Sequence, residues 1–369
     1  MTSDRQALSR LRAQARQARA DGCFVQAARL ERQVAERAGV LGLAGERTRA
    51  LLWEGYSLRQ AGEDDLALAT LLQAANERAV TADPADVFSA LIAIIHISLE
   101  RKTASFCRAL LEQGRRFLAD IQQPWTAPLD FLEGQLAYRR GDFAAARDWH
   151  SHAWAGWRDE HPHLTAATHL WALCRVAFRR HDPVELERLV EQLNHLHPTQ
   201  ALERQLTQRA RLLLWRARRT VDLAHPASEP APVETALALL TASADGASRD
   251  TGARQEALRV LALADRWEEV DAALSRQPLQ PDTFETALLL GNLALNRARM
   301  ALGLPVMDDE YGAAGDSEPL SSPVPVALPE VERHYQVAGR WAETEDERLE
   351  TNWYNNRLKI FLENATSFI

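Results

Sequence analysis

A turn signal recurs at a nearly constant interval through the first half of this chain. The turn positions are Gly22, Gly62, Lys102, Gly141 and His181, spaced 40, 40, 39 and 40 residues apart. Apolar residues with helical periodicity lie on both sides of each position. Such an interval is typical of repeated helix-turn-helix units, in which each unit buries its apolar face against its neighbours.

Three further registers repeat together with the turns. They mark positions where the two helices of a unit are expected to approach closely, and many of their residues are small. Five residues after the turns come Ala27, Ala67, Cys107, Ala146 and Leu186. Seven residues further on come Val34, Ala74, Gly114, Ala153 and Leu193. Seven residues before the turns come Ala15, Gly55, Ile95, Gly134 and Cys174. Pro84, Pro124 and Pro162 fall between units, where a helix is expected to stop.

This pattern resembles tetratricopeptide repeats, in the longer form of about 40 residues found in MalT-type bacterial regulators. The resemblance covers residues 8–197. It departs from the repeat pattern at Lys102 and His181, which replace turn glycines, and at Cys107 and Leu186, which replace the alanine of the second helix. The resemblance implies a right-handed α-solenoid of antiparallel helix pairs that binds other proteins. It implies no chemistry.

The whole chain is predicted to be all-α, because no stretch alternates with period two for long enough to form a strand. We expect five regular repeats over 1–198, less regular helical pairs over 199–302, a mobile loop rich in Pro, Gly and acids over 303–329, and a C-terminal helical cap over 330–369. The helices expected after the repeats are Thr199–Thr220, Glu234–Ala244, Gly252–Ala264, Trp267–Ser275 and Phe284–Leu302, with a linker at 225–232 and a turn at Asp265. The cap is expected to carry an apolar stripe of Leu349, Trp353, Ile360 and Phe361.

Composition narrows the function classes. The chain is 46% apolar and 25% charged, which argues against general disorder. Its net charge of −8 argues against a dedicated nucleic-acid coat protein, although residues 1–50 carry ten Arg against five acids. Cys23, Cys107 and Cys174 are far apart and are expected to be buried thiols in a reducing compartment. With no signal peptide or membrane span in the sequence, a cytoplasmic location is expected.

No sequence motif of catalysis or phosphate handling is present, so we expect neither enzymatic activity nor a cofactor. His150 and His152 lie two apart on a predicted helix and therefore face different ways, which argues against a metal site. Trp154 and Trp157 share a face with His150, either as core residues or as a ligand platform. A run of arginines over 204–219 is either a solvated face paired with acids or a phosphate-binding surface.

The resemblance to tetratricopeptide arrays implies that the first helix of each unit lines a concave groove. This groove would be basic at its N-terminal end and aromatic in its middle. Its predicted residues are Arg12, Arg16, Arg19, Tyr56, Arg59, His96, Phe131, Gln135, Tyr138, Trp171, Arg175, Phe178 and Arg179. An alternative is that the aromatic members fill the gap between tightly packed helices. The acidic 303–329 segment is a further candidate, as a lid that competes for the groove.

Three functions follow from these features. The first is a non-catalytic adaptor or regulatory subunit that binds an acidic protein segment with aromatic residues in the groove. The second is a module of a bacterial regulatory system that senses a small effector or a short peptide. The third is an arginine-rich solenoid that binds nucleic acid, which the acidic total disfavours.

Overall fold

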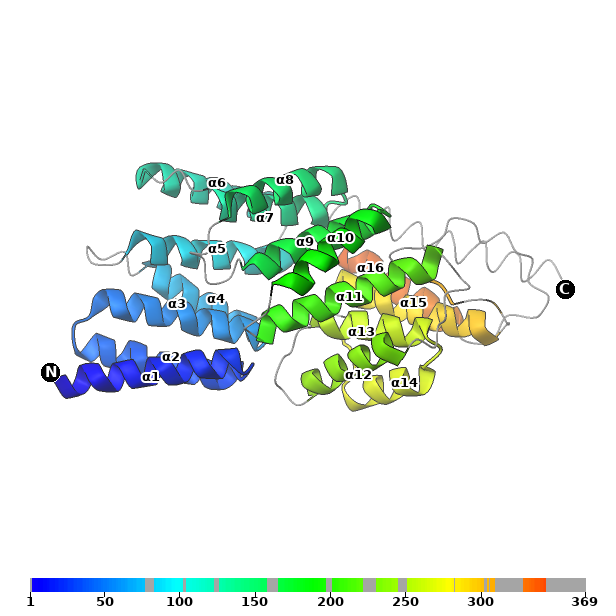
Figure 1. Ribbon diagram of the computed structural model, residues 1–369, viewed down its shortest axis with the longest axis horizontal. Coiled ribbons are helices and arrows are strands. Elements are labelled where there is room, and N and C mark those ends of the chain that lie inside the picture. Colours follow the sequence, from blue (N-terminus) through cyan, green and yellow to red (C-terminus); the bar gives the residue numbers. More distant parts are fainter. Residues whose placement is uncertain are drawn as a thin grey trace. The chain divides into compact units, whose positions relative to one another are not determined.

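The protein is all-α wherever its structure is described. The computed structural model describes residues 2–76, 83–101, 104–122, 126–157, 165–196, 201–221, 230–244, 251–281, 283–301, 304, 306–308 and 328–342. These residues form sixteen α-helices and no strand (Figure 1). The helices are α1 Thr2–Ala20, α2 Phe24–Val40, α3 Ala44–Gln60, α4 Asp64–Asn76, α5 Pro84–Arg101, α6 Ala104–Asp120, α7 Ala127–Arg139, α8 Phe143–Gly156, α9 Ala166–Arg179, α10 Pro183–His195, α11 Ala201–Val221, α12 Pro230–Ala244, α13 Thr251–Leu263, α14 Trp267–Arg276, α15 Phe284–Ala301 and α16 Leu328–Trp341.

The predicted turns are confirmed where the structure describes them. Gly22, Gly62, Gly141 and His181 have φ values of 78°, 77°, 76° and 55°, in the left-handed region. In each turn, the residue after this position donates its N–H to the carbonyl of the residue five positions before the donor, at 2.8 to 3.0 Å. This is the hydrogen bond of a Schellman motif, which ends a helix and favours glycine because glycine has no Cβ to clash. Lys102 lies outside the described residues, but α5 and α6 end and begin on either side of it.

The three predicted registers of close helix approach are also confirmed. All five residues that follow the turns by five positions, from Ala27 to Leu186, are completely buried. A Cβ added to Gly55 would lie 2.6 Å from Leu71 Cγ, and one added to Gly134 would lie 2.6 Å from His150 Cε1. Small residues at these positions therefore allow the two helices of a pair to pack at short range.

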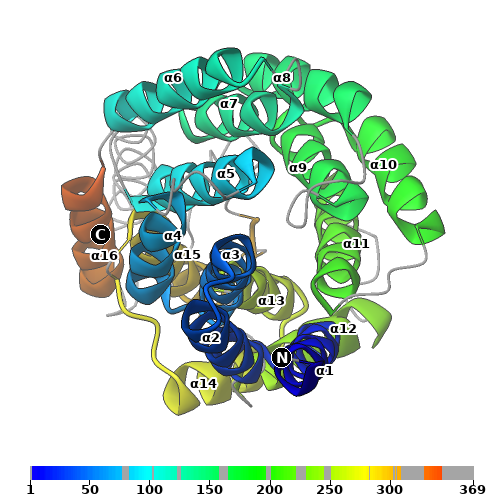
Figure 2. The same cartoon turned by 90° about the vertical axis from the view of Figure 1, so that its left-hand side faces the viewer.

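The chain divides into two compact units, each described here by itself. The first contains Met1–Val176, Arg188–Gln208 and Thr241–Thr251. Within it, each helix from α1 to α7 contacts the next one in sequence, and α3 also contacts α5, which contacts α7. Figure 2 shows two layers in part of this unit, with α5 and α7 in one and α6 and α8 in the other. Helix pairs thus stack one after another, as expected for an α-solenoid.

The second unit contains Ala177–Glu187, Arg209–Leu240 and Gly252–Ile369. Its helix α13 is almost entirely buried in an apolar cluster with α12, α14 and α15. Helix α16 packs on α15, where the Tyr335 ring lies over Gly291 and the Tyr335 hydroxyl donates to Asn292 Oδ1 at 2.6 Å. This packing covers one side of α15.

Three of the expectations from the sequence need correction. Pro230 to Pro232, predicted as linker, form the first turn of α12, where proline is tolerated because the first amides of a helix need no intrahelical acceptor. Within the predicted mobile loop, Met307 exchanges two backbone hydrogen bonds with the Asn296 side chain at 2.9 and 3.0 Å, and Asp308 is buried. Cys23, in the turn between α1 and α2, is exposed rather than buried.

Other predictions for the second half lie outside the described residues. These are the rest of the loop, its role as a lid, the linker residues 225–229 and the apolar stripe from Leu349 to Phe361. None of the helices in the described ranges is long and apolar enough to cross a membrane.

Candidate partner-binding pocket

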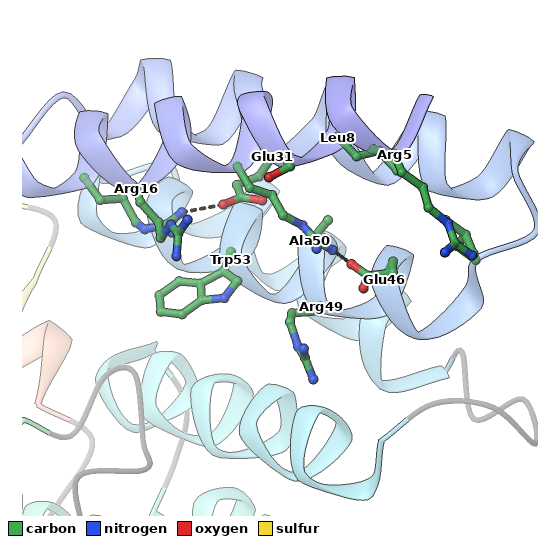
Figure 3. A pocket seen from close by; sticks show the side chains of 12 residues that line it. Arg5, Leu8, Arg16, Glu31, Glu46, Arg49, Ala50 and Trp53 are labelled. Atoms are coloured by element: carbon green, nitrogen blue, oxygen red, sulfur yellow. Dashed lines mark hydrogen bonds and ion pairs between the residues drawn. The ribbon is translucent and has the colours of Figure 1, made fainter. Parts of the chain in front are cut away.

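A pocket of about 620 Å³ opens between α1 and α3 in the first unit (Figure 3). Arg16 and Trp53 lie toward one end of the view and Arg5 toward the other, with Glu46 and Arg49 between them. Helix α2 contributes Glu31. The full lining is Arg5, Leu8, Ser9, Arg12, Arg16, Arg19, Glu31, Leu43, Glu46, Arg49, Ala50 and Trp53.

The arginine row on α1 follows from helical periodicity. Arg5, Arg12, Arg16 and Arg19 are separated by seven, four and three residues, which places them on one side of a helix. Over this distance α1 rises about 21 Å. Leu8 and Ala15 on the adjoining face are buried. Helix α1 therefore packs through its apolar face and presents a row of guanidinium groups to the pocket.

Some of these charges are already paired. Arg12 forms an ion pair with Glu46, and Arg19 Nη1 donates to Glu31 Oε1 at 2.6 Å. Arg49 Nε lies 3.1 Å from Asp86 Oδ2 at the start of α5. Arg5 and Arg16 are exposed, and neither forms an ion pair with the residues that the structure describes. These two side chains are available to an added anion.

The pocket has an excess of positive charge in a partly dehydrated setting. Its lining holds five arginines and two glutamates, a formal excess of three. Burial lowers the pKa of Arg12, and repulsion from Arg49 and Arg16 lowers it further, although Glu31 opposes this shift. Burial raises the pKa of Glu31, although Arg19 counteracts the shift. An additional negative charge would relieve the repulsion among these cations.

Trp53 gives the pocket an aromatic wall. The Arg19 guanidinium carbon lies 4.2 Å from the centre of its ring, a cation–π contact. The ring also meets Tyr56 edge to face at 5.9 Å between centroids. Tyr56 itself is buried, and its hydroxyl donates to the Ser89 carbonyl at 2.8 Å. The pocket can thus accept apolar surface beside its charges.

The structure brings only part of the predicted groove together in this pocket. Arg12, Arg16 and Arg19 line it, whereas Arg59 forms an ion pair with Asp64 at 2.8 Å. Four predicted groove aromatics are buried and pack in the core: Tyr56, Phe131, Trp171 and Phe178. The partly buried members are His96, Gln135, Tyr138, Arg175 and Arg179.

Among the partly buried members, Tyr138 and Arg175 contact each other. The Arg175 guanidinium carbon lies 4.2 Å from the centre of the Tyr138 ring. Both side chains retain some exposure. This contact is a second exposed feature of the predicted groove, but the pocket between α1 and α3 does not include it.

Sequence reasoning missed six lining residues that matter to the pocket: Arg5, Leu8, Glu31, Glu46, Arg49 and Trp53. Arg5 was detectable, because it precedes Arg12 by seven residues on the same helix face. Glu46 and Arg49 come from the neighbouring repeat, and their approach to α1 has no local signal in the sequence.

Two histidines of the histidine-rich region, His150 and His169, are buried. His150 is buried between Phe131 and Gly134, whereas the His152 side chain is 70% exposed and contacts Asp130 at 3.1 Å, so the two histidines face different ways as predicted. Trp154 and Trp157 stack on each other at 5.4 Å and adjoin His169. No group of three or more potential ligands that could hold a metal ion occurs among the described residues, from which His161, His163 and His197 are missing.

Several arginines in the run of α11 form ion pairs with carboxylates. Arg209 binds Glu256 at 3.0 and 3.1 Å, and Arg218 pairs with Glu187. Arg216 is completely buried and forms two hydrogen bonds with Asp308, at 2.7 and 2.8 Å. These contacts favour the interpretation of paired charges over a phosphate-binding surface.

Comparison with known proteins gives little further information. No protein-family model matches the chain, and no curated protein matches it. A solved structure described as the TPR domain of P58(IPK) aligns over 96% of this chain and 98% of its own, at 12% sequence identity and a TM-score of 0.25. A TM-score this low carries no argument, and the fold assignment above rests on the helix pairs themselves.

Proposed function

We propose that the protein is a non-catalytic interaction module that captures an acidic segment of a partner protein in the pocket between α1 and α3. The observation that carries the proposal is the excess of arginine in a 620 Å³ cavity, with Arg5 and Arg16 exposed beside it. Charge complementarity of this kind steers an acidic partner and excludes basic ones.

The row of arginines also specifies the form of the partner segment. A compact anion would contact one end of a row that extends about 21 Å along α1. An extended chain rises about 3.3 Å per residue, so about six residues would follow the whole row. Successive side chains of such a segment point to opposite sides, which allows acids to meet the arginines while the intervening apolar residues contact Leu8, Leu43 and Trp53.

The proposal extends to the setting in which the protein works and to a second contact with the partner. Regulatory use in a bacterial cytoplasm is consistent with the resemblance to MalT-type repeats and with Cys23, Cys107 and Cys174, which are all free thiols. The partner segment need not engage Trp171 or Phe178, because both are core residues. We propose Tyr138 and Arg175 as a second, weaker contact for a longer partner.

A small anionic effector is the second candidate, because the cavity volume lies in the range typical of small-molecule sites, about 300 to 1,000 Å³. A thermal-shift comparison of short acidic peptides with small carboxylates and phosphates separates the two. An effector should raise the unfolding temperature at concentrations where no peptide does.

The binding test uses a six-residue probe with blocked ends, glutamate at alternate positions, and leucine and phenylalanine between them. Arg16→Glu should raise the dissociation constant about tenfold, because it reverses a charge in the row without removing an existing ion pair. Arg10→Glu is the matched control, since Arg10 is exposed on α1 outside the pocket. Fluorescence anisotropy measures both constants. Equal weakening by both variants, or no binding of the probe, would contradict the proposed function.

A further inference from the structure

The arginine row has an interruption at its centre. Arg12 lies between Arg5 and Arg16 in the row, and it is the member that pairs with Glu46. The Glu46 carboxylate therefore occupies the position where the middle acid of an extended segment would bind. A partner segment that followed the whole row would bring a second carboxylate against it.

The two glutamates of the pocket differ in how firmly they are held. The Glu31 side chain is only 4% exposed, and its partner Arg19 also rests on the Trp53 ring. The Glu46 side chain is 39% exposed, and that of Arg12 is 31% exposed. An ion pair this accessible is weak, because water screens the attraction and hydrates the separated charges. Glu31 is thus a fixed counter-ion, whereas Glu46 can exchange.

The position of Glu46 also lowers the cost of releasing it. Glu46 lies in the first turn of α3, where the N-terminal end of the helix dipole stabilises a negative charge. When Glu46 leaves Arg12 it can turn toward solvent and retain that interaction. Release of Glu46 would leave Arg12 partly buried and repelled by Arg49 and Arg16, with Glu31 as its remaining attractive charge.

We propose that Glu46 is an internal competitor that holds Arg12 until a carboxylate of the acidic partner displaces it. The proposal rests on the function proposed above and adds a regulatory residue to the same site. With Glu46 released, Arg5, Arg12 and Arg16 form a continuous row for the partner. Glu46 thereby lowers affinity for weakly acidic chains and favours a partner that can replace it at Arg12.

The decisive variant is Glu46→Gln, which removes the competing charge and retains the size of the side chain. The dissociation constant of the six-residue acidic probe should fall about three- to tenfold. Glu36→Gln is the matched control, because Glu36 is exposed on α2 and does not line the pocket, and it should leave the constant unchanged. Thermal unfolding of each variant checks that the fold is retained.

A double-mutant comparison tests whether Arg12 is the residue that Glu46 masks. Arg12→Gln should weaken probe binding more in the Glu46→Gln background than in the wild-type protein, because only the first has Arg12 free. If Glu46→Gln does not fold, Glu46→Asp provides the same test, since the shorter carboxylate reaches Arg12 less well and should also tighten binding.

The outcomes separate this inference from the proposed function. If the wild-type protein binds the probe with the expected dependence on Arg16, but Glu46→Gln binds it no more tightly, the competitor role is wrong and the pocket remains. If neither the wild-type protein nor Glu46→Gln binds the probe, both proposals fail.

Discussion

At the scale of single residues, His150 is an unusual group among those that the structure describes. It is 1% exposed, and neither ring nitrogen has a hydrogen-bond partner among the described residues. Burial lowers its pKa to about 3, with further contributions from His169 and Arg175. An imidazole in this position is neutral at physiological pH and acts as an aromatic core side chain against Phe131.

This burial predicts an acid sensitivity. The pKa of His150 is lower in the folded state than in the unfolded chain, where it is about 6.5, so the unfolded chain binds the proton first. The stability that depends on neutral His150 is therefore present above pH 6.5 and is lost progressively as the pH falls toward 3. Between pH 7.5 and pH 5 the loss should be about 2 kcal/mol, from roughly 1.4 kcal/mol per pH unit below 6.5.

Urea unfolding at the two pH values measures this effect. His150→Leu should show a drop in unfolding free energy between pH 7.5 and pH 5 that is about 2 kcal/mol smaller than in the wild-type protein. His152→Leu, at an exposed position two residues away, should retain the wild-type drop. An identical drop in the His150 variant would show that the imidazole is not held neutral.

At the scale of helices and turns, the same backbone conformation is carried by different residues. Gly22, Gly62 and Gly141 occupy the left-handed turn position without strain, whereas His181 and Asp265 have φ values of 55° and 59°. A side chain in this conformation costs about 1 to 2 kcal/mol, because its Cβ approaches the following carbonyl oxygen.

Opposite substitutions at equivalent turns should therefore change stability in opposite directions. His181→Gly should stabilise the protein by up to about 1 kcal/mol, after the greater entropy of glycine in the unfolded chain is subtracted. Gly141→Ala should destabilise it by about 1 kcal/mol or more. Calorimetric unfolding temperatures measure both changes, and a lower temperature for His181→Gly would contradict the explanation.

The turns and the buried registers were predictable because both are local and periodic. A glycine followed by an alanine five positions later reports the end of one helix and its contact with the next, as at Gly141 and Ala146. The groove aromatics were not predictable in the same way. Helix α9 is buried at every described position from His169 to Phe178 except Arg175, so it has no polar side from which to tell groove from core.

The candidate pocket was predictable only in part. Four of its arginines, Arg5, Arg12, Arg16 and Arg19, share a face of α1, which the spacing shows directly. Its shape depends on how α3 packs beside α1, and this brings Glu46 and Arg49 to the row from a different repeat. A contact of this kind depends on the angle between helices, which the side-chain pattern of either helix does not specify.

At the scale of the whole molecule, the buried pair of Arg216 and Asp308 joins segments that are 92 residues apart. Both side chains are completely inaccessible, and the Arg216 guanidinium carbon lies 4.8 Å from the centre of the Phe178 ring. No local pattern in the sequence predicts this contact. It fixes the residues that follow α15 to α11 within the second unit.

Removing one partner of this pair should be costly. Asp308→Asn would leave the Arg216 charge buried without its carboxylate, and should reduce the unfolding free energy by about 3 to 5 kcal/mol. The double variant Arg216→Met, Asp308→Leu should lose less, because no charge remains buried. Glu187→Gln, which breaks the exposed pair with Arg218, should cost less than about 1 kcal/mol. Chemical denaturation measures all three, and similar losses from Asp308→Asn and Glu187→Gln would contradict this account.

The stacking of consecutive helices in the first unit has a consequence for how the chain folds during its synthesis. Helices α1 to α8 mainly contact their neighbours in the sequence, which is a low contact order and favours rapid folding. All residues that line the arginine pocket lie between Arg5 and Trp53, so they leave the ribosome before helices α4 to α16. We therefore expect the pocket to form during synthesis and to be available to an acidic partner while the rest of the chain is still being translated.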